Sequence, residues 1–459
     1  MLRLAGKRAV AAAASSCSSL RSHTSLCNSF SPITNRPHCT NAPPNTNPVA
    51  VQMINYAFSH ARSQKSDGSY AEALLVLEQG ISNFQGVDKS SEDAIGMVLL
   101  AMATLLAERG DYVDAIDKLQ LVQELNVASI SLRVAAMEAL VGLHLQMEKD
   151  IAASEIADNC LQFFKDNHED DDATCRKLHL RAKAMKGLVD LVNGNLESAK
   201  SSYEGCHYSV DDGSCFGQVA LSYGEFLHSS GDFSLAKDLY QKAIKVSQEK
   251  NAPDSSSVAA AGMVSEEVIL GATCALGQLH THSGNFQEAE EVLTQALKKA
   301  EEHFGLNHPK VGAVLTCMAL LYGHNARLHG ASSLLIQEGL YRRALDLLKA
   351  PTLDTDGKIN DNLCLMLSSY LFAMIKLFML DVCVVGADIQ TNRSDVMVLT
   401  RGGYAQALQV QQNRKDEGER MKKWAENTWR NRRLSLYQAL EITEPSKVPV
   451  IDTRIERVL

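Results

Sequence analysis

Fourteen histidines are the side chains of this 459-residue sequence best suited to binding a metal ion or moving a proton. His280 and His282 lie two residues apart, a spacing that points them to different sides of a helix. His303 and His308 flank a break between two expected helices, where we expect them to cap a helix or pack the loop. No histidine pair therefore predicts a metal or proton-transfer site.

The other chemically capable residues do not form a known catalytic pattern. The acidic run from Glu169 to Asp172 lacks the alternating ligands and glycine of a calcium loop, so we expect a solvated loop. The sequence contains no phosphate-binding loop, dinucleotide fingerprint, nucleophile elbow or His-Glu-x-x-His motif. Eleven cysteines without a Cys-x-x-Cys pair indicate free or buried thiols in a reducing compartment. We therefore expect no catalytic residue, no metal, no cofactor and no enzymatic activity.

Residues 284–322 are expected to form a helical hairpin, which contains His303 and His308. A turn at Gly284 opens an expected helix with Ala289 and Leu293 on one apolar stripe. A break from Gly305 to Pro309 ends that helix, and a second apolar stripe follows through residues 311–321. Neither helix can bury its stripe alone, so this hairpin requires neighbours of the same design.

Copies of the hairpin signature recur along the chain. The signature is a glycine, then an aromatic residue or leucine two positions later, then an alanine five positions after the glycine. A spacing of 84 residues between the second and third copies, twice the 42 between the first two, predicts a degenerate copy at Lys149, Asp150, Ile151 and Ser154. The seven clear copies are Gly68, Tyr70 and Ala73; Gly110, Tyr112 and Ala115; Gly194, Leu196 and Ala199; Gly231, Phe233 and Ala236; Gly284, Phe286 and Ala289; Gly339, Tyr341 and Ala344; and Gly402, Tyr404 and Ala407.

The signature has a local physical reason. Glycine permits the tight turn, and a small alanine lets two helices approach closely. A second small residue occurs seven positions before four of the glycines, on the preceding helix, at Ala103, Gly187, Gly224 and Gly277. We expect these small residues to set the distance between the two helix axes of each hairpin.

This arrangement resembles the tetratricopeptide-repeat superfamily, over residues 49–350 and more weakly to about 412. The resemblance implies an all-α fold, a right-handed α-solenoid of about six to eight helical hairpins, with a concave surface that binds a peptide or helix. Residues 296–322 resemble the longer repeats of kinesin light chains through Gly305, His308 and Pro309. They depart from those repeats at Thr316 and Cys317, where adjacent asparagines are common. The basic residues with which some of these domains hold chaperone carboxylates are not recognisable.

Residues 1–48 are predicted to be a transit peptide and linker. They contain no acidic residue, many serines and alanines, and scattered arginines, whereas Lys7 and Arg8 interrupt any secretory apolar core. Arg3 at the start of an amphipathic helix favours import into the mitochondrial matrix, and the chloroplast is the alternative organelle. The alternative to a transit peptide is an ordinary disordered N-terminus. The first acidic residue is Asp67, so the negative charge lies in the body of the chain and argues against DNA binding.

The last hundred residues divide into two predicted parts. Residues 351–412 read as a degenerate or interrupted repeat, whose apolar run 363–385 is interpreted as a buried helix, with a membrane span or an insertion as alternatives. Lys376 and Asp381 within that run make a span unlikely to be stable. Residues 413–459 read as a basic capping helix and a C-terminal arm that folds back or docks elsewhere.

The sequence leads to two functional hypotheses. The first is a non-enzymatic scaffold of mitochondria, which binds another protein in its concave groove and assists assembly of a complex. The alternative is an organelle RNA-associated factor. Its basis is the basic tail with Trp424 and Trp429, because aromatic and basic residues together can bind single-stranded RNA. The plainer interpretation of that tail is a cap whose tryptophans pack on the last repeat.

Overall fold

The computed structural model describes residues 47–84, 88–166, 173–206, 216–249, 258–330, 333–351, 394–441 and 447–459. The predicted transit peptide and the apolar run 363–385 lie outside these residues, apart from the last two positions of 1–48. A division of the chain by internal contacts separates residues 1–41 from 42–459, and the fold described below belongs to the second unit.

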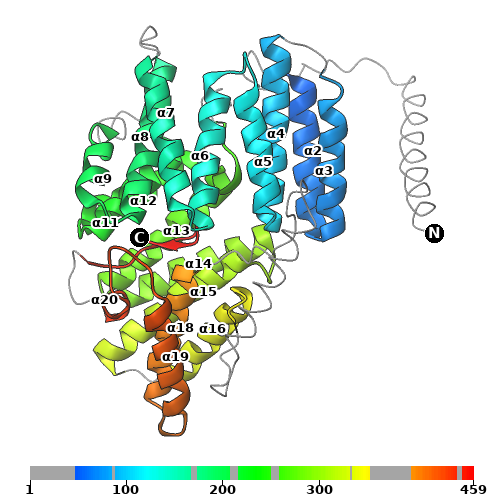
Figure 1. Ribbon diagram of the computed structural model, residues 1–459. Coiled ribbons are helices and arrows are strands. Elements are labelled where there is room, and N and C mark those ends of the chain that lie inside the picture. Colours follow the sequence, from blue (N-terminus) through cyan, green and yellow to red (C-terminus); the bar gives the residue numbers. More distant parts are fainter. Residues whose placement is uncertain are drawn as a thin grey trace, which may run out of the picture. The chain divides into compact units, whose positions relative to one another are not determined.

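The described chain is built from consecutive antiparallel helix pairs, which confirms the predicted all-α solenoid of helical hairpins (Figure 1). Each helix packs against the next one in the sequence. The pairs are α2 (Pro48–Gln64) and α3 (Asp67–Ile81), α4 (Lys89–Arg109) and α5 (Tyr112–Glu124), α6 (Ile130–Gln146) and α7 (Asp150–Asp166), α8 (Ala173–Val192) and α9 (Leu196–Tyr203), α11 (Gly217–Ser229) and α12 (Phe233–Gln248), α13 (Ser265–His282) and α14 (Phe286–Phe304), α15 (Pro309–His329) and α16 (Leu334–Leu347), and α18 (Ser394–Gln409) and α19 (Lys415–Thr428).

Smaller elements complete the described chain. Two short 3-10 helices are η3 (Ala261–Met263) and η4 (Gln412–Arg414), and α20 (Leu436–Glu441) follows α19. Two strands, β1 (Ile451–Asp452) and β2 (Arg457–Val458), pair antiparallel with Ile451 opposite Val458. Figure 1 shows these strands beside α13, well away from a free edge of the helical array.

Four of the signature glycines make the turns that the sequence predicts. Gly110, Gly194, Gly231 and Gly284 have φ between 77° and 91°, the left-handed region that favours glycine. The next residue then donates its N–H to a carbonyl five positions back, as Asp111 N does to Leu106 O at 2.9 Å. This hydrogen bond ends the first helix and lets the second begin at once.

The other copies need correction. The degenerate copy exists one residue earlier than predicted, because Glu148 takes the left-handed conformation at φ 59° and Ala153, instead of Ser154, is fully buried. Gly68, Gly339 and Gly402 are not at turns, since they lie inside α3, α16 and α18. There the aromatic and alanine positions carry the packing: Tyr70, Ala73, Tyr341, Ala344, Tyr404 and Ala407 are all buried.

The predicted small residues do set the spacing within hairpins. A Cβ atom at Gly187 would lie 2.6 Å from the ring of Tyr203, and one at Gly277 would lie 2.6 Å from Leu293. Gly224 is similarly close to Tyr240, at 2.8 Å. Real Cβ atoms do not approach other atoms this closely, so larger residues at these positions would push the two helices apart.

First helices such as α6 and α13 are buried on nearly every side, whereas second helices such as α14 bury one stripe. Among the described helices, α4 is the one long and apolar enough to cross a bilayer by length and composition, and 67% of its apolar window is buried within the fold. A core helix passes the same test. Burial on the inner side of first helices requires a cover, and residues 258–263 and 447–459 provide it.

Candidate interaction surface inside the solenoid

Residues 447–459, here called the inner segment, lie on the inner side of the first helices. Its twelve residues from Val448 to Leu459 are all buried, and several are completely inaccessible. It contacts α6, α7, α11, α13 and α18 and the loop residues Asn431 and Arg433, and the side chains of these parts that contact it are called the inner surface. The predicted arm therefore folds back onto the repeats.

One part of the inner surface recognises backbone. Gln278 of α13 accepts a hydrogen bond from Ile451 N at 2.8 Å and donates one to Ile451 O at 3.0 Å. Asn431 donates to Val458 O at 2.6 Å, and Arg433 donates to Leu459 O at 2.7 Å. A side-chain amide that satisfies both polar groups of one residue substitutes for a neighbouring strand. These contacts bind main-chain groups on both strands of the hairpin formed by β1 and β2, and they do not depend on its side chains.

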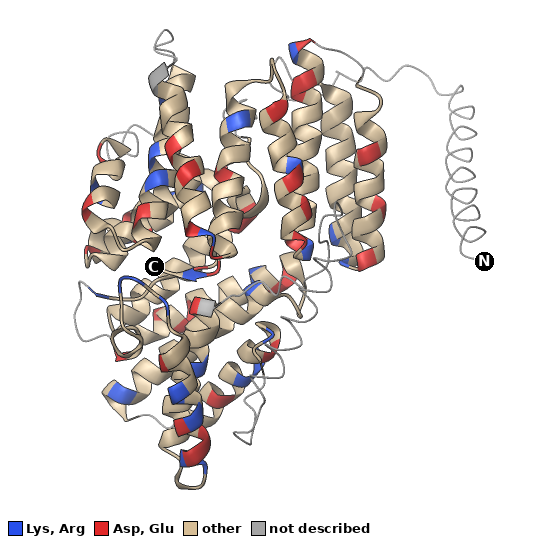
Figure 2. Cartoon of the chain, viewed as in Figure 1, with Lys and Arg blue, Asp and Glu red and all other residues tan. Residues whose placement is uncertain are grey.

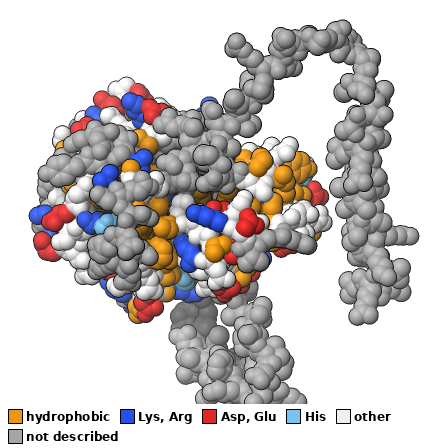
Figure 3. All heavy atoms as spheres, turned by 90° about the horizontal axis from the view of Figure 1, so that it is seen from above, with side chains coloured by type: hydrophobic (Ala, Val, Ile, Leu, Met, Phe, Trp, Pro, Cys, Tyr) orange, Lys and Arg blue, Asp and Glu red, His pale blue; other side chains and the backbone are white. Residues whose placement is uncertain are grey.

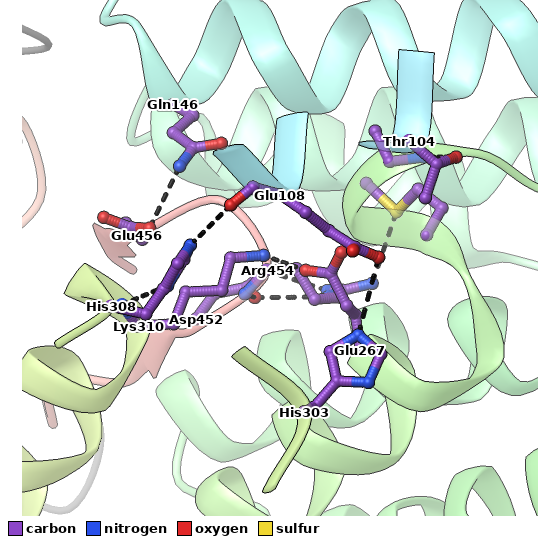
Figure 4. Close-up of polar contacts among 12 residues, drawn as sticks. Thr104, Glu108, Gln146, Glu267, His303, His308, Lys310, Asp452, Arg454 and Glu456 are labelled. Carbon is purple, nitrogen blue, oxygen red and sulfur yellow. Dashed lines mark hydrogen bonds and ion pairs between the residues drawn. The ribbon is translucent and has the colours of Figure 1, made fainter. Parts of the chain in front are cut away.

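A second part recognises Arg454, which is wholly buried. Its guanidinium donates to Glu225 of α11 at 2.6 Å and to Ser222 at 3.1 Å. It also donates to Asp452 within the segment at 2.8 Å (Figure 4). Burial raises the pKa of Glu225 well above its usual value, and the positive charge of Arg454 opposes this rise only in part. The guanidinium thus lies between two buried carboxyl groups, one on the repeats and one within the segment.

A third part recognises Arg457, three residues further on. Its guanidinium donates to Asp395 of α18 at 2.8 Å, to Asp150 of α7 at 2.9 Å and to the carbonyl of Leu145 at 2.9 Å. The two carboxylates come from helices far apart in the sequence, so this arginine ties early and late repeats together. Asp150 was predicted as part of the degenerate turn, and the sequence offered no sign of this second role.

Glu456 adds a contact from the segment to the repeats. It accepts a hydrogen bond from Gln146 at 3.0 Å, and Gln146 also donates to Tyr112 at 2.9 Å (Figure 4). Tyr112 is one of the signature aromatics, so the inner segment is connected to the packing within a hairpin. Every described side chain of the segment between Asp452 and Arg457 is thus buried against the repeats or against the segment itself.

The two histidines beside the Gly305 to Pro309 break join distant repeats. His308 Nδ1 accepts from Lys310 N at 3.1 Å, so its Nε2 carries the proton and donates to Glu108 O at 2.9 Å (Figure 4). His303 Nε2 lies 3.6 Å from Glu108 Oε1, just beyond hydrogen-bond distance. The predicted capping and loop-packing roles are present, and the partner lies 200 residues upstream.

Glu108 collects several positive and polar partners at this junction. Arg62 donates to it at 2.6 Å and the hydroxyl of Tyr70 donates at 3.1 Å. Burial alone would raise the pKa of Glu108, but His303 and Arg62 outweigh it and hold that pKa at about 2. Glu108 is therefore ionised at any physiological pH, and the junction is structural in character.

Most of the other histidines and the cysteines of the described ranges lie in the interior or at helix ends. Within the described ranges, no three His, Cys, Asp or Glu side chains are placed to hold a metal ion. His282 Nδ1 lies 2.8 Å from His228 Nε2, and His280 does not join them. None of the described cysteines forms a disulfide, and the sulfur atoms of Cys274 and Cys317 lie 3.5 Å apart. This agrees with thiols buried in a core.

Both tryptophans of the basic tail are engaged by the fold. Arg401 lies over the ring of Trp424 at 4.0 Å, and Trp429 Nε1 donates to Leu434 O at 2.6 Å. Positive and negative side chains alternate along α19 and do not form a single basic face (Figure 2). The tail thus has the packing of the predicted capping helix, with both tryptophan rings partly buried against the last repeats.

An open cavity of about 700 Å³ lies between the ends of α15, α16, α18, α19 and α20. Its lining is mixed, with Leu334 and Val410 beside Arg327, Lys422 and Glu426. Val410 is 74% exposed. Exposed apolar side chains also gather in the centre of the face seen from above (Figure 3).

A sequence model of the tetratricopeptide-repeat family matches residues 270–310. The match covers most of α13, the Gly284 turn, α14 and the Gly305 to Pro309 break. No curated protein matches the chain.

Proposed function

Because the chain belongs to the tetratricopeptide-repeat superfamily, we propose that it is a non-enzymatic scaffold that binds another protein. The observation that carries the proposal is the inner surface, where Gln278 hydrogen-bonds to a peptide backbone and carboxyl groups from separate repeats pair with two arginines. Backbone contacts hold a segment of chain in place and the carboxylates select its side chains. That combination suits protein recognition and contains no group for covalent chemistry.

We place this scaffold in the mitochondrial matrix and propose that it assists assembly of a protein complex. The support is the composition of residues 1–48, which is rich in serine, alanine and arginine and free of acid. Fusion of residues 1–50 to a fluorescent reporter tests the location. We expect a mitochondrial signal, whereas a chloroplast signal would select the alternative organelle and a cytosolic signal would refute import.

The alternative is an RNA-associated factor, and the packing of Trp424 and Trp429 against the last repeats leaves less of each ring exposed for stacking on bases. Its remaining support is the exposed cations of α19, such as Lys415, Arg420 and Lys423. Charge reversal at these three positions leaves the packed tryptophans in place, which deletion of the tail would not. Unchanged RNA recovery from this variant would remove the tail from any RNA-binding role.

The main experiment is a pull-down with the tagged full chain from organelle extract, with and without ribonuclease. We expect the same protein partners in both samples, and partners that vanish after ribonuclease treatment would overturn the scaffold proposal. Two variants locate the docking surface: Arg457→Ala weakens the inner segment, and Val410→Glu alters the open cavity. Partner recovery that changes with the first variant alone assigns the inner surface, and a change with the second alone assigns the cavity.

A further inference from the structure

The inner segment has the position of a ligand. It adds no strand to a larger sheet, because β1 and β2 pair only with each other among the described strands. Its tie to the repeats consists of side-chain contacts from five helices that are joined in sequence without it. The helices that surround it complete their own turns, as at Gly231 and Gly284. The helices and turns of the repeats are therefore complete without a strand or turn from this segment.

We propose that the inner surface is a binding site for a short β-hairpin segment with two arginines three residues apart, one in the turn and one on the returning strand, and that residues 447–459 occupy it as a ligand in cis. This inference rests on the proposed function, since it names the chemistry of the partner that the scaffold takes. A competing partner presents the same features: a backbone free to pair with Gln278, and arginines at the positions of Arg454 and Arg457.

Charge supports this assignment. Glu225, Asp150 and Asp395 belong to the repeats and not to the segment, so without the segment these three carboxyl groups would lose the guanidinium that each of them contacts. Carboxylates without a cation in a poorly hydrated site are costly, and a guanidinium matches each of them with directed hydrogen bonds. Arginine suits both positions better than lysine because its planar group can reach two acceptors at once.

The composition of the segment indicates that the inner surface binds it specifically, and that the segment does more than fill space in the core. Apolar residues of similar volume would fill this space at lower cost than four buried charged residues, Asp452, Arg454, Glu456 and Arg457. Buried polar pairs instead select one register and one sequence. An interior that needed only to be filled would not require three acids from α7, α11 and α18 to converge on two arginines.

The test uses the full chain with a specific protease site placed in residues 442–446 and cleaved after folding. A fluorescent peptide of sequence Lys447–Leu459 is then added, and exchange is followed by anisotropy and native mass spectrometry. We expect saturable exchange, and a peptide with Arg454→Ala should bind at least about a hundredfold more weakly. A peptide with Arg454→Lys is the matched comparison, because it keeps the positive charge and loses the planar group, and it should lose less affinity than the Arg454→Ala peptide.

Two results would overturn the assignment. One is a cleaved segment that never exchanges with the peptide although the protein stays folded. The other is equal exchange of peptides with and without the two arginines. If cleavage unfolds the protein, the intact chain carrying Arg457→Ala serves instead. That variant should take up the labelled peptide where the unmodified chain does not, and equal uptake refutes the site. Failure here with partners still recovered in the ribonuclease-treated pull-down would discard the site and leave the scaffold function standing.

Discussion

Arg454 and Arg414 are each held by two carboxylates, and they differ in their access to water. Arg454 lies between Asp452 and Glu225 with all three side chains fully buried. Arg414, at the start of α19, contacts Glu338 and Glu417 with 28% of its side chain exposed. The same pairing of a guanidinium with two carboxyl groups therefore occurs once in the interior and once at the solvent-exposed surface. Water replaces lost partners at the second site and cannot do so at the first, so their contributions to stability should differ severalfold.

Arg454→Ala should have the largest effect. The substitution leaves Asp452 and Glu225 without their cation in a site closed to water, and we expect a loss of about 3–5 kcal/mol in the free energy of unfolding. Chemical denaturation of the full chain measures it. Arg454→Met, which keeps volume and removes the same charge, is the control for cavity formation. A loss below about 1 kcal/mol would show that the inner segment is not held by this cluster.

Glu108 supplies an intermediate case with a clear dependence on pH. Its pKa in the fold is about 2, below the ordinary value of 4.5, so its contribution is fully present above pH 4.5. That contribution is lost as pH falls from about 4.5 towards 2, by about 3 kcal/mol in all. Unfolding measured across this range should show the loss in the wild type and a smaller slope in Glu108→Gln.

Glu225 is the matched comparison for that titration, because its pKa is displaced in the opposite direction. A raised pKa in the fold contributes stability below the pKa of the unfolded chain, and this contribution is lost as pH rises through the folded value. Glu225→Gln should therefore keep the acid-side slope that Glu108→Gln reduces. Identical acid-side slopes in both variants would mean that Glu108 is not the group responsible.

Local pattern was enough to predict the hairpins but not what lies inside them. A glycine that must take a positive φ, as Gly284 does, and a small residue seven positions earlier, as Gly277 is, act within one hairpin and are visible in a short window of sequence. The degenerate copy was displaced by one residue because Glu148, and no glycine, takes the left-handed conformation. Glycine position alone therefore cannot fix the register of a turn.

The inner surface escaped prediction for a different reason. Gln278 and Ile451 lie 173 residues apart, and Glu225 and Arg454 lie 229 apart. Each is an ordinary polar or apolar residue in its own window, and a periodic pattern carries no information on which distant segment covers a helix. The short run of valine, isoleucine and arginine near the end of the chain was the only available sign, because charged residues there alternate with strongly apolar ones.

Arg414→Ala should have the smallest effect and so closes the comparison. Arg414 has two carboxylate partners and also contacts the hydroxyl of Tyr404 at 3.1 Å, more partners than most surface residues. Solvent still reaches the guanidinium, so the expected loss in the free energy of unfolding is about 1 kcal/mol or less, and it should shrink further in high salt. If Arg414→Ala cost as much as Arg454→Ala and resisted salt, partner number would outweigh burial in this protein. The cap formed by α19 would then rank with the inner segment as a support of the fold.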